Sequence, residues 1–278
     1  MLTNKFKFNY SIGSVANGIK TDTFTFFLLF FYSNIIGLNP ASAGLAIFIA
    51  LCVDAITDPL MGTISDRTNS KYGRRHPYMM ISFIPMSLGY ILLFAPRQDW
   101  DMSQGDLFIW MTLFTILTRI GMTLFDIPHR AFGGEVTKDY EERTLLMSWR
   151  EMIGWVAGLS NAFLGYGIFF ASTPEYPQGQ LNPDAWFPFA LTGAIFMVGT
   201  VLYSSVATKD EIKGLSKWKG SITLVEILSE LKIAVTNKAF LIFFFGNLFL
   251  SLAWGLANTL TLFVNTYFWE FEATQIKY

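Results

Sequence analysis

Two carboxylates stand four residues apart inside an otherwise apolar stretch of the chain. Asp54 and Asp58 belong to the sequence Val53-Asp-Ala-Ile-Thr-Asp-Pro59, and side chains four residues apart share one face of a helix. Like charges this close repel, so either one carboxyl takes up a proton or a cation lies between them. The structural alternative is that Asp58 caps a kink at Pro59 while Asp54 pairs with a basic residue. We favour a cation such as Na+, because capping would not need two acids.

A third acid and a hydroxyl extend this candidate cation site. Asp126 follows Thr123 by three residues, so both side chains share a helical face. If this stretch packs against the one with the paired acids, Asp54, Asp58 and Asp126 would hold Na+ with Thr123 beside them. Arg119 lies two turns before Asp126. It either forms a structural ion pair with one of the acids or donates a bidentate hydrogen bond to a polar or anionic substrate.

Three further charges lie in apolar stretches, where a charge is a functional hypothesis by default. Lys20 and Asp22 are two residues apart, so they do not face each other and each needs a partner on another helix. Arg150 opens a later apolar stretch, where its alternative role is to extend to the membrane surface. The candidate substrate-binding residues are therefore Lys20, Asp22, Arg119, Asp126 and Arg150.

Two other pairs of residues have a structural interpretation. His76 and His129 lie near the ends of apolar stretches beside basic residues, so we interpret both as interfacial and not as proton relays. Gly154 and Gly158 are spaced as a small-xxx-small pair, which indicates close helix packing.

The composition decides what kind of protein must position these side chains. The chain has 278 residues, of which 52% are hydrophobic and 15% are charged, against about 25% charged in soluble domains. Apolar runs of about twenty residues without strict alternation exclude both a soluble fold and a barrel. A net charge of −1 argues against nucleic-acid binding, and the single Cys52 excludes a disulfide framework. Catalytic motifs and a phosphate loop are absent, so we expect neither an enzyme nor a bound cofactor.

The apolar runs predict an all-α integral membrane protein with seven spans. The predicted spans are residues 10–36, 41–65, 76–96, 105–129, 145–171, 185–206 and 239–269.

Lys and Arg in the connections predict the orientation of these spans. Of the 20 basic residues, sixteen fall on the side that holds the N-terminus, whereas only Arg97 and Lys277 fall on the other. Because basic loops stay inside, we expect a multi-pass protein of the plasma (inner) membrane with a cytoplasmic N-terminus and an outer C-terminus.

The longest connection divides the chain. We expect a six-helix bundle over residues 1–206, a cytoplasmic linker over 207–238, and the first helix of a second bundle over 239–278. Within the linker, Ser221 is a candidate N-cap for a short amphipathic helix at the membrane surface. The apolar face of that helix would consist of Ile222, Val225, Leu228 and Leu231.

Several motifs closely resemble those of the glycoside–pentoside–hexuronide cation symporters, the melibiose-permease branch of the major facilitator superfamily. The paired acids are followed by the sequence Asp58-Pro-Leu-Met-Gly-Thr-Ile-Ser-Asp-Arg-Thr-Asn-Ser-Lys-Tyr-Gly-Arg-Arg-His-Pro-Tyr78. The element Asp126-Ile-Pro128 and the run Asp139-Tyr-Glu-Glu-Arg-Thr144 ahead of Arg150 resemble the same family.

The resemblance implies a function and roles for individual residues. It implies the major facilitator fold and cation-coupled symport of a sugar, with Asp54, Asp58, Thr123 and Asp126 at the cation and with Asp126 and Arg150 at the sugar. It also implies a cytoplasmic gate, in which glycine would allow close helix approach while Asp66 and the arginines form an ionic latch. The gate residues would be Gly62, Asp66, Arg67, Gly73, Arg74 and Arg75.

The chain also departs from the family pattern. An ungapped alignment places Gly18 where the melibiose-permease branch has a sugar-binding acid, with Asp22 one turn further along the same face. The branch's stacking tryptophan in the fourth helix aligns with Arg130. Both changes argue against galactoside specificity, and Arg119 makes an anionic uronide conceivable.

We therefore expect a secondary active transporter that couples Na+ or H+ to a sugar, glycoside or uronide by alternating access, monomeric when full length. Two alternatives remain: a symporter of the same fold that moves a lysolipid or another amphiphile, and a seven-helix receptor or retinal pump. The pump fits poorly, because no Lys lies between Lys238 and Lys277 to form a Schiff base. Because a carrier of this family has twelve helices, we also expect the 278-residue chain to be truncated.

Overall fold

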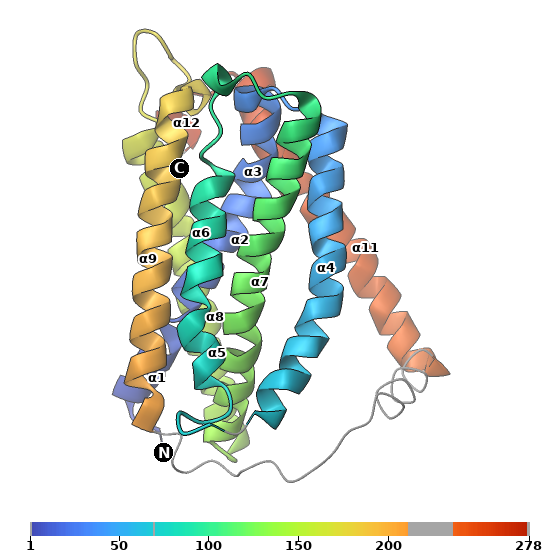
Figure 1. Cartoon of the computed structure of the whole chain (residues 1–278), viewed down its shortest axis with the longest axis vertical. Helices are drawn as coiled ribbons and strands as arrows, with labels where there is room; N and C mark the ends of the chain where they lie inside the picture. The colour runs from blue at the N-terminus through green and yellow to red at the C-terminus, as the bar shows by residue number, and fades with distance from the viewer. Residues whose placement is uncertain (1, 69, 211–235, 277–278) are drawn as a thin grey trace.

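The computed structural model describes residues 2–68, 70–210 and 236–276, and within these ranges the regular elements are all helices. Most of them form one bundle of alternating direction (Figure 1). The longer helices are α2 (Ser14–Asp22), α4 (Pro40–Arg67), α6 (Phe83–Leu93), α7 (Gln104–Val136), α8 (Tyr140–Leu164), α9 (Trp186–Ala207) and α11 (Lys238–Phe263). The shorter ones are α1 (Asn4–Ser11), η1 (Thr23–Phe27), α3 (Leu28–Phe30), η2 (Phe31–Ile36), α5 (His76–Ile81), η3 (Gln98–Trp100), η4 (Gly165–Phe169), η5 (Gly179–Leu181), η6 (Pro183–Ala185), η8 (Val264–Phe268) and α12 (Ala273–Ile276).

Six helical stretches among the described residues are long and apolar enough to cross a membrane. They coincide with six of the seven predicted spans. The predicted span 10–36 is helical as well, but it is divided into α2, η1, α3 and η2, because the wide π-helical turns η1 and η2 interrupt the α-helical hydrogen bonding. These four elements follow one another without a gap from Ser14 to Ile36, so the predicted span is helical over most of its length.

The long helices begin at side-chain caps that satisfy their first backbone N–H groups. Asn39 accepts from the N–H of Ala41 at 2.9 Å at the start of α4, where Pro40 occupies the first turn. Ser103 begins α7 with a capping box that includes Asp106. These local signals fix where each span starts. The corresponding caps of α8 and α11 are Asp139 and Asn237.

Helices α2 and α8 cross closely because glycines line the contact. A Cβ atom at Gly18 would lie 2.1 Å from the carbonyl oxygen of Gly154, and one at Gly158 would lie 3.3 Å from the carbonyl oxygen of Gly18. Only a residue without a side chain fits at Gly18. The close packing predicted from Gly154 and Gly158 is confirmed, with Gly18 as the third member.

Aromatic side chains pack together at the end of the bundle where α9 begins. Figure 1 shows that this end lies away from the N-terminus. Trp186, at the start of α9, is fully buried and packs against Phe94 and Phe170 at ring-centroid distances of 6.3 and 4.7 Å. Phe27 and Phe31 from the divided first segment contact the same indole. Burial of such large rings is the main favourable contribution to packing at this end.

Helix α11 leans away from the bundle and meets it mainly near one end (Figure 1). Near that end the backbone oxygen of Thr266 accepts from Gln178 at 3.1 Å, and the Tyr267 hydroxyl donates to Asn34 at 2.7 Å. Along the rest of α11 the apolar side chains are exposed. The amphipathic helix predicted over residues 221–232 lies outside the described residues.

Candidate functional site

The paired acids of α4 face α7. A guanidinium nitrogen of Arg119 donates to Asp54 Oδ2, and Thr123 Oγ1 donates to Asp58 Oδ1 at 2.7 Å. The expected packing of these two stretches is therefore present. Arg119 and Asp54 therefore form an ion pair, which is the structural role that the sequence offered as the alternative to substrate or cation binding. The other oxygen of Asp54, Oδ1, is buried and has no hydrogen-bond partner among the described residues.

Asp126 forms its hydrogen bonds with two arginines and does not join Asp54 and Asp58 in one group of carboxylates. Its Oδ1 accepts from Arg150 of α8, and its Oδ2 accepts from Arg130 Nε at 2.7 Å. Arg150 also donates to Glu151 at 2.6 Å. In the described part of the chain, no three acidic, His or Cys side chains gather as metal ligands. We refer to Asp54, Asp58, Arg119, Thr123, Asp126 and Arg150 as the inner cluster.

His129 contacts Arg150 and helps to position it, although His129 was not among the predicted site residues. The imidazole Nε2 donates to the backbone oxygen of Tyr10 at 3.0 Å, so Nδ1 is left to accept from Arg150 Nε at 3.5 Å. The ring is fully buried and stacks on Tyr10 and Phe125 at 4.1 and 4.8 Å. The interfacial interpretation of His129 is wrong, because this part of α7 faces the interior of the bundle.

His76 is buried too. Its Nε2 lies 3.1 Å from the Thr208 hydroxyl, and its ring meets Phe132 edge to face at 4.9 Å. The interfacial interpretation of His76 is therefore also wrong. A weak signal for burial is present in the sequence: the residues three and four positions after each histidine, which share its helical face, are not charged or polar. They are Phe132 and Gly133 after His129, and Met79 and Met80 after His76.

The two charges of the first segment differ in their surroundings. Asp22 Oδ2 accepts from Asn161 of α8 at 3.0 Å, so the expected partner on another helix is present. Lys20 Nζ lies 5.8 Å from the centre of the Phe24 ring, and the Arg119 guanidinium lies 5.4 Å from the same ring. Lys20 thus lies near Arg119 of the inner cluster, whereas Asp22 contacts Asn161 of α8.

A pocket of about 400 Å³, lined by both polar and apolar side chains and called the polar pocket below, opens beside Asp22. Its walls come from α2, η1, α8 and α11, so side chains from distant parts of the chain converge there. They include Asp22, Glu151, Trp155, Trp254 and Asn258. A concave site with a few polar groups among aromatic rings is the usual form of a small-molecule site.

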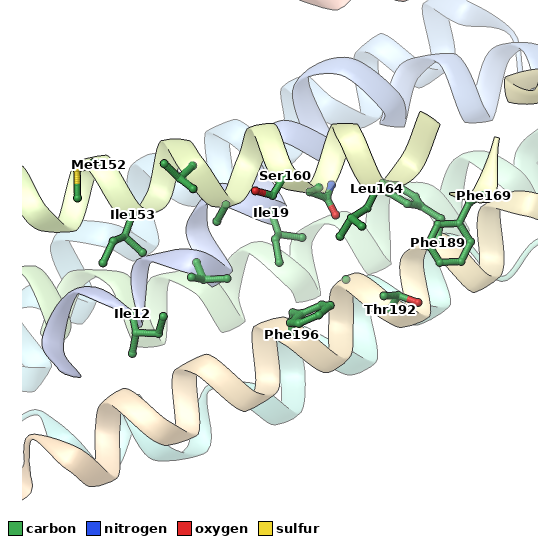
Figure 2. A pocket seen from close by; sticks show the side chains of 15 residues that line it. Ile12, Ile19, Met152, Ile153, Ser160, Leu164, Phe169, Phe189, Thr192 and Phe196 are labelled. Carbon is green, nitrogen blue, oxygen red and sulfur yellow. The ribbon is translucent and has the colours of Figure 1, made fainter. Parts of the chain in front are cut away.

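A second pocket, of about 370 Å³, lies on another side of α8 and is apolar. Figure 2 shows side chains of α8, such as Ile153 and Leu164, facing Phe196 of α9, with Ile19 of α2 between them. Such walls offer little to hydroxyl groups and suit hydrocarbon.

The predicted gate motif forms an ion-pair group at the end of the bundle. Arg75 donates to Asp66 at 2.5 Å and to Glu135 at 3.0 Å, and Arg74 donates to the same Glu135 at 2.7 Å. Asp66, Arg74, Arg75 and Glu135 are called the end cluster below. Glu135 was missed because α7 continues to Val136, seven residues beyond the predicted span end at 129.

The other gate residues have different roles. Gly73 has a φ of +83° in the turn before α5, a conformation that glycine adopts without strain. A Cβ at Gly62 would meet only Ile127 Cγ2 at 3.7 Å, which is an ordinary contact. Close helix approach at Gly62 is therefore not observed, and that prediction is wrong. Arg67 lies at the last residue of α4.

Comparison with known proteins identifies the family. The family model described as MFS/sugar transport protein matches residues 9–278. An uncharacterized symporter of Synechocystis is 30% identical over 210 residues, 74% of this chain and 38% of the relative. The isoprimeverose transporter of Lactiplantibacillus pentosus is 24% identical over 243 residues, 87% of this chain and 48% of that protein.

A third relative has a different kind of substrate in its name. The sodium-dependent lysophosphatidylcholine symporter 1-A of Danio rerio is 30% identical over 169 residues, 59% of this chain and 31% of that protein. The chain thus spans about half or less of the length of these relatives. With a family model that matches nearly all of its residues, the chain belongs to the MFS/sugar transport protein family, a family of multi-pass membrane transporters and not of enzymes.

Proposed function

We propose that the protein couples a cation, Na+ or H+, to the transport of a sugar, glycoside or uronide by alternating access. Membership of a sugar transport family supports this, as do the relatives named as symporters. The isoprimeverose transporter supports a sugar as the substrate, and the sodium-dependent relative supports Na+ as the coupling ion.

The observation that carries the proposal is the buried oxygen of Asp54 that faces no donor among the described residues. Asp54 Oδ1 and the nearby hydroxyl of Thr57 are both buried without a hydrogen-bond partner there. Buried polar atoms without partners are rare in folded proteins. A cation between Asp54 and Asp58 would satisfy them and would relieve the repulsion between the two carboxylates. Thr123 is already hydrogen-bonded to Asp58 and would complete this side of the site.

Coupling would follow from the competition between the cation and Arg119 for Asp54. A bound cation neutralises the acid, so Arg119 is released to a polar or anionic substrate. A second exchange would occur at Asp126, where substrate hydroxyls replace part of its hydrogen bonding to Arg150. Lys20 lies beside Arg119 at the Phe24 ring, whereas Asp22 lines the pocket formed with α8. By linkage, the substrate then raises cation affinity by the factor by which the cation raises substrate affinity.

The arrangement of the bundle supports the proposed membrane orientation. The N-terminus and the connection from α4 to α5 lie at one end (Figure 1), which also carries Arg74 and Arg75. We place this end in the cytoplasm of the cell, with the protein in the plasma membrane. The bundle of α1–α9 and the separate α11 would belong to the two halves that rock against each other.

The test is cation-stimulated uptake by the protein in proteoliposomes. We expect Asp58→Cys to abolish stimulation by a Na+ or H+ gradient, because the paired site loses one charged ligand. Asp99→Cys, in an exposed connection, is the matched control and should behave as wild type. Unchanged cation stimulation in Asp58→Cys would refute the assignment of the site.

A second candidate substrate is a lysolipid. The apolar pocket between α8 and α9 favours it, because an acyl chain fits walls of this kind while its headgroup reaches polar residues elsewhere. The relative named as a lysophosphatidylcholine symporter points the same way. Uptake of labelled lysophosphatidylcholine, measured beside a sugar panel under the same Na+ gradient, separates the two candidates.

A further inference from the structure

Two indole rings lie together on the wall of the polar pocket. Trp155 of α8 and Trp254 of α11 are 6.5 Å apart between ring centroids, and their planes meet at 78°. Both side chains are exposed and line the pocket, so part of each indole surface is open to a molecule there. An indole offers a broad, rigid apolar face, which makes tryptophan a frequent anchor in binding sites.

The same pocket also supplies hydrogen-bonding groups. Asp22 is 8% exposed and keeps one oxygen on Asn161, while its carboxylate has further acceptor capacity. Thr21 and Asn258 also line the pocket. A sugar ring has an apolar C–H face and a rim of hydroxyls, so it requires both kinds of wall at once.

We propose that Trp155 and Trp254 form the stacking platform for the sugar ring, with Asp22 accepting from its hydroxyls. This inference rests on the proposed function and names the part of the site that selects the substrate. The platform itself consists of Trp155 from α8 of the bundle and Trp254 from α11. It is therefore assembled only when these two parts of the chain approach each other.

The test is uptake of radiolabelled methyl glycosides and methyl glucuronides by the protein in proteoliposomes. We expect Trp155→Ala to raise the half-saturating sugar concentration about tenfold, which corresponds to about 1.4 kcal/mol of binding free energy. Trp155→Tyr should retain most of the affinity, and the half-saturating cation concentration should stay unchanged in both variants. Trp254→Ala should show the same loss as Trp155→Ala.

Trp100→Ala is the matched control, because Trp100 forms a similar edge-to-face pair with Trp110 away from the pocket. If the wild type takes up a sugar but Trp155→Ala and Trp100→Ala have equal half-saturating concentrations, the platform is refuted while the proposed function stands. If the wild type takes up none of the sugars under either gradient, the proposed function fails and this inference fails with it. The unfolding temperature of each variant in detergent distinguishes lost binding from lost folding.

Discussion

The inner cluster and the end cluster both connect α4 with α7, and both contain carboxylates paired with arginines. They differ in their access to water. The side chains of Asp54 and Asp126 are 20% and 17% exposed, whereas those of Asp66 and Glu135 are 43% and 34% exposed. Charges with less access to water depend more strongly on their partners, while better solvated charges exchange partners more easily. The inner cluster therefore suits the proposed cation site, and the end cluster suits the proposed latch.

The largest effect that would test this comparison comes from Asp126→Asn. Arg150 is 1% exposed, so the variant leaves a buried guanidinium without its main counter-charge, a change of about 3–5 kcal/mol in other proteins. We expect a large fall in the unfolding temperature in detergent. The double variant Asp126→Asn/Arg150→Gln should recover part of it, because no unpaired charge remains. An unfolding temperature equal to that of wild type would show that Arg150 finds another partner.

A smaller effect is expected from Glu135→Gln at the end cluster. Glu135 is the shared partner of Arg74 and Arg75, but it is partly solvated, so we expect a loss of about 1 kcal/mol or less. The measurement is the access of a thiol reagent to this end of the bundle. Ser65 is buried, so we would introduce Ser65→Cys in a Cys52→Ser background. The new thiol should react faster when Glu135→Gln weakens the proposed latch. Equal labelling rates with and without Glu135→Gln would mean that ion pairs do not keep this end closed.

The smallest effect is expected from Gly62→Ala, which lies on α4 between the two clusters. The added Cβ meets only an ordinary contact, and alanine favours the helix over glycine by about 1 kcal/mol. We expect an unchanged or slightly higher unfolding temperature and normal labelling of the cysteine at Ser65. A lower unfolding temperature would instead indicate that α4 and α7 approach each other closely at Gly62.

Much of the fold could be predicted because the membrane imposes strong rules. Apolar runs of about twenty residues located six of the spans, and helix periodicity placed Asp58 opposite Thr123 once the two helices packed. The sequence pattern could not show which acid pairs with which arginine, because partners on different helices depend on helix rotation. Asp126 was therefore expected beside Asp54 and Asp58, but its hydrogen bonds go to Arg130 and Arg150.

The errors have related physical causes. His129 and His76 were judged by their position along the chain, whereas burial depends on the face of the helix that they occupy. Glu135 was outside the predicted span, although α7 continues as a helix past the apolar region. The pocket at Asp22 could not be found at all, because Trp155 and Trp254 are about a hundred residues apart in sequence and meet only through the placement of α11.

The Gly18 crossing restricts how the proposed substrate selectivity could be redesigned. An engineer who wished to restore the family's acid in the first helix would introduce aspartate at Gly18, directly into the backbone of Gly154. The expected product is a separated helix pair and not a galactoside carrier. Changes of substrate are accessible one turn later, at Asp22, where the side chain already reaches the pocket.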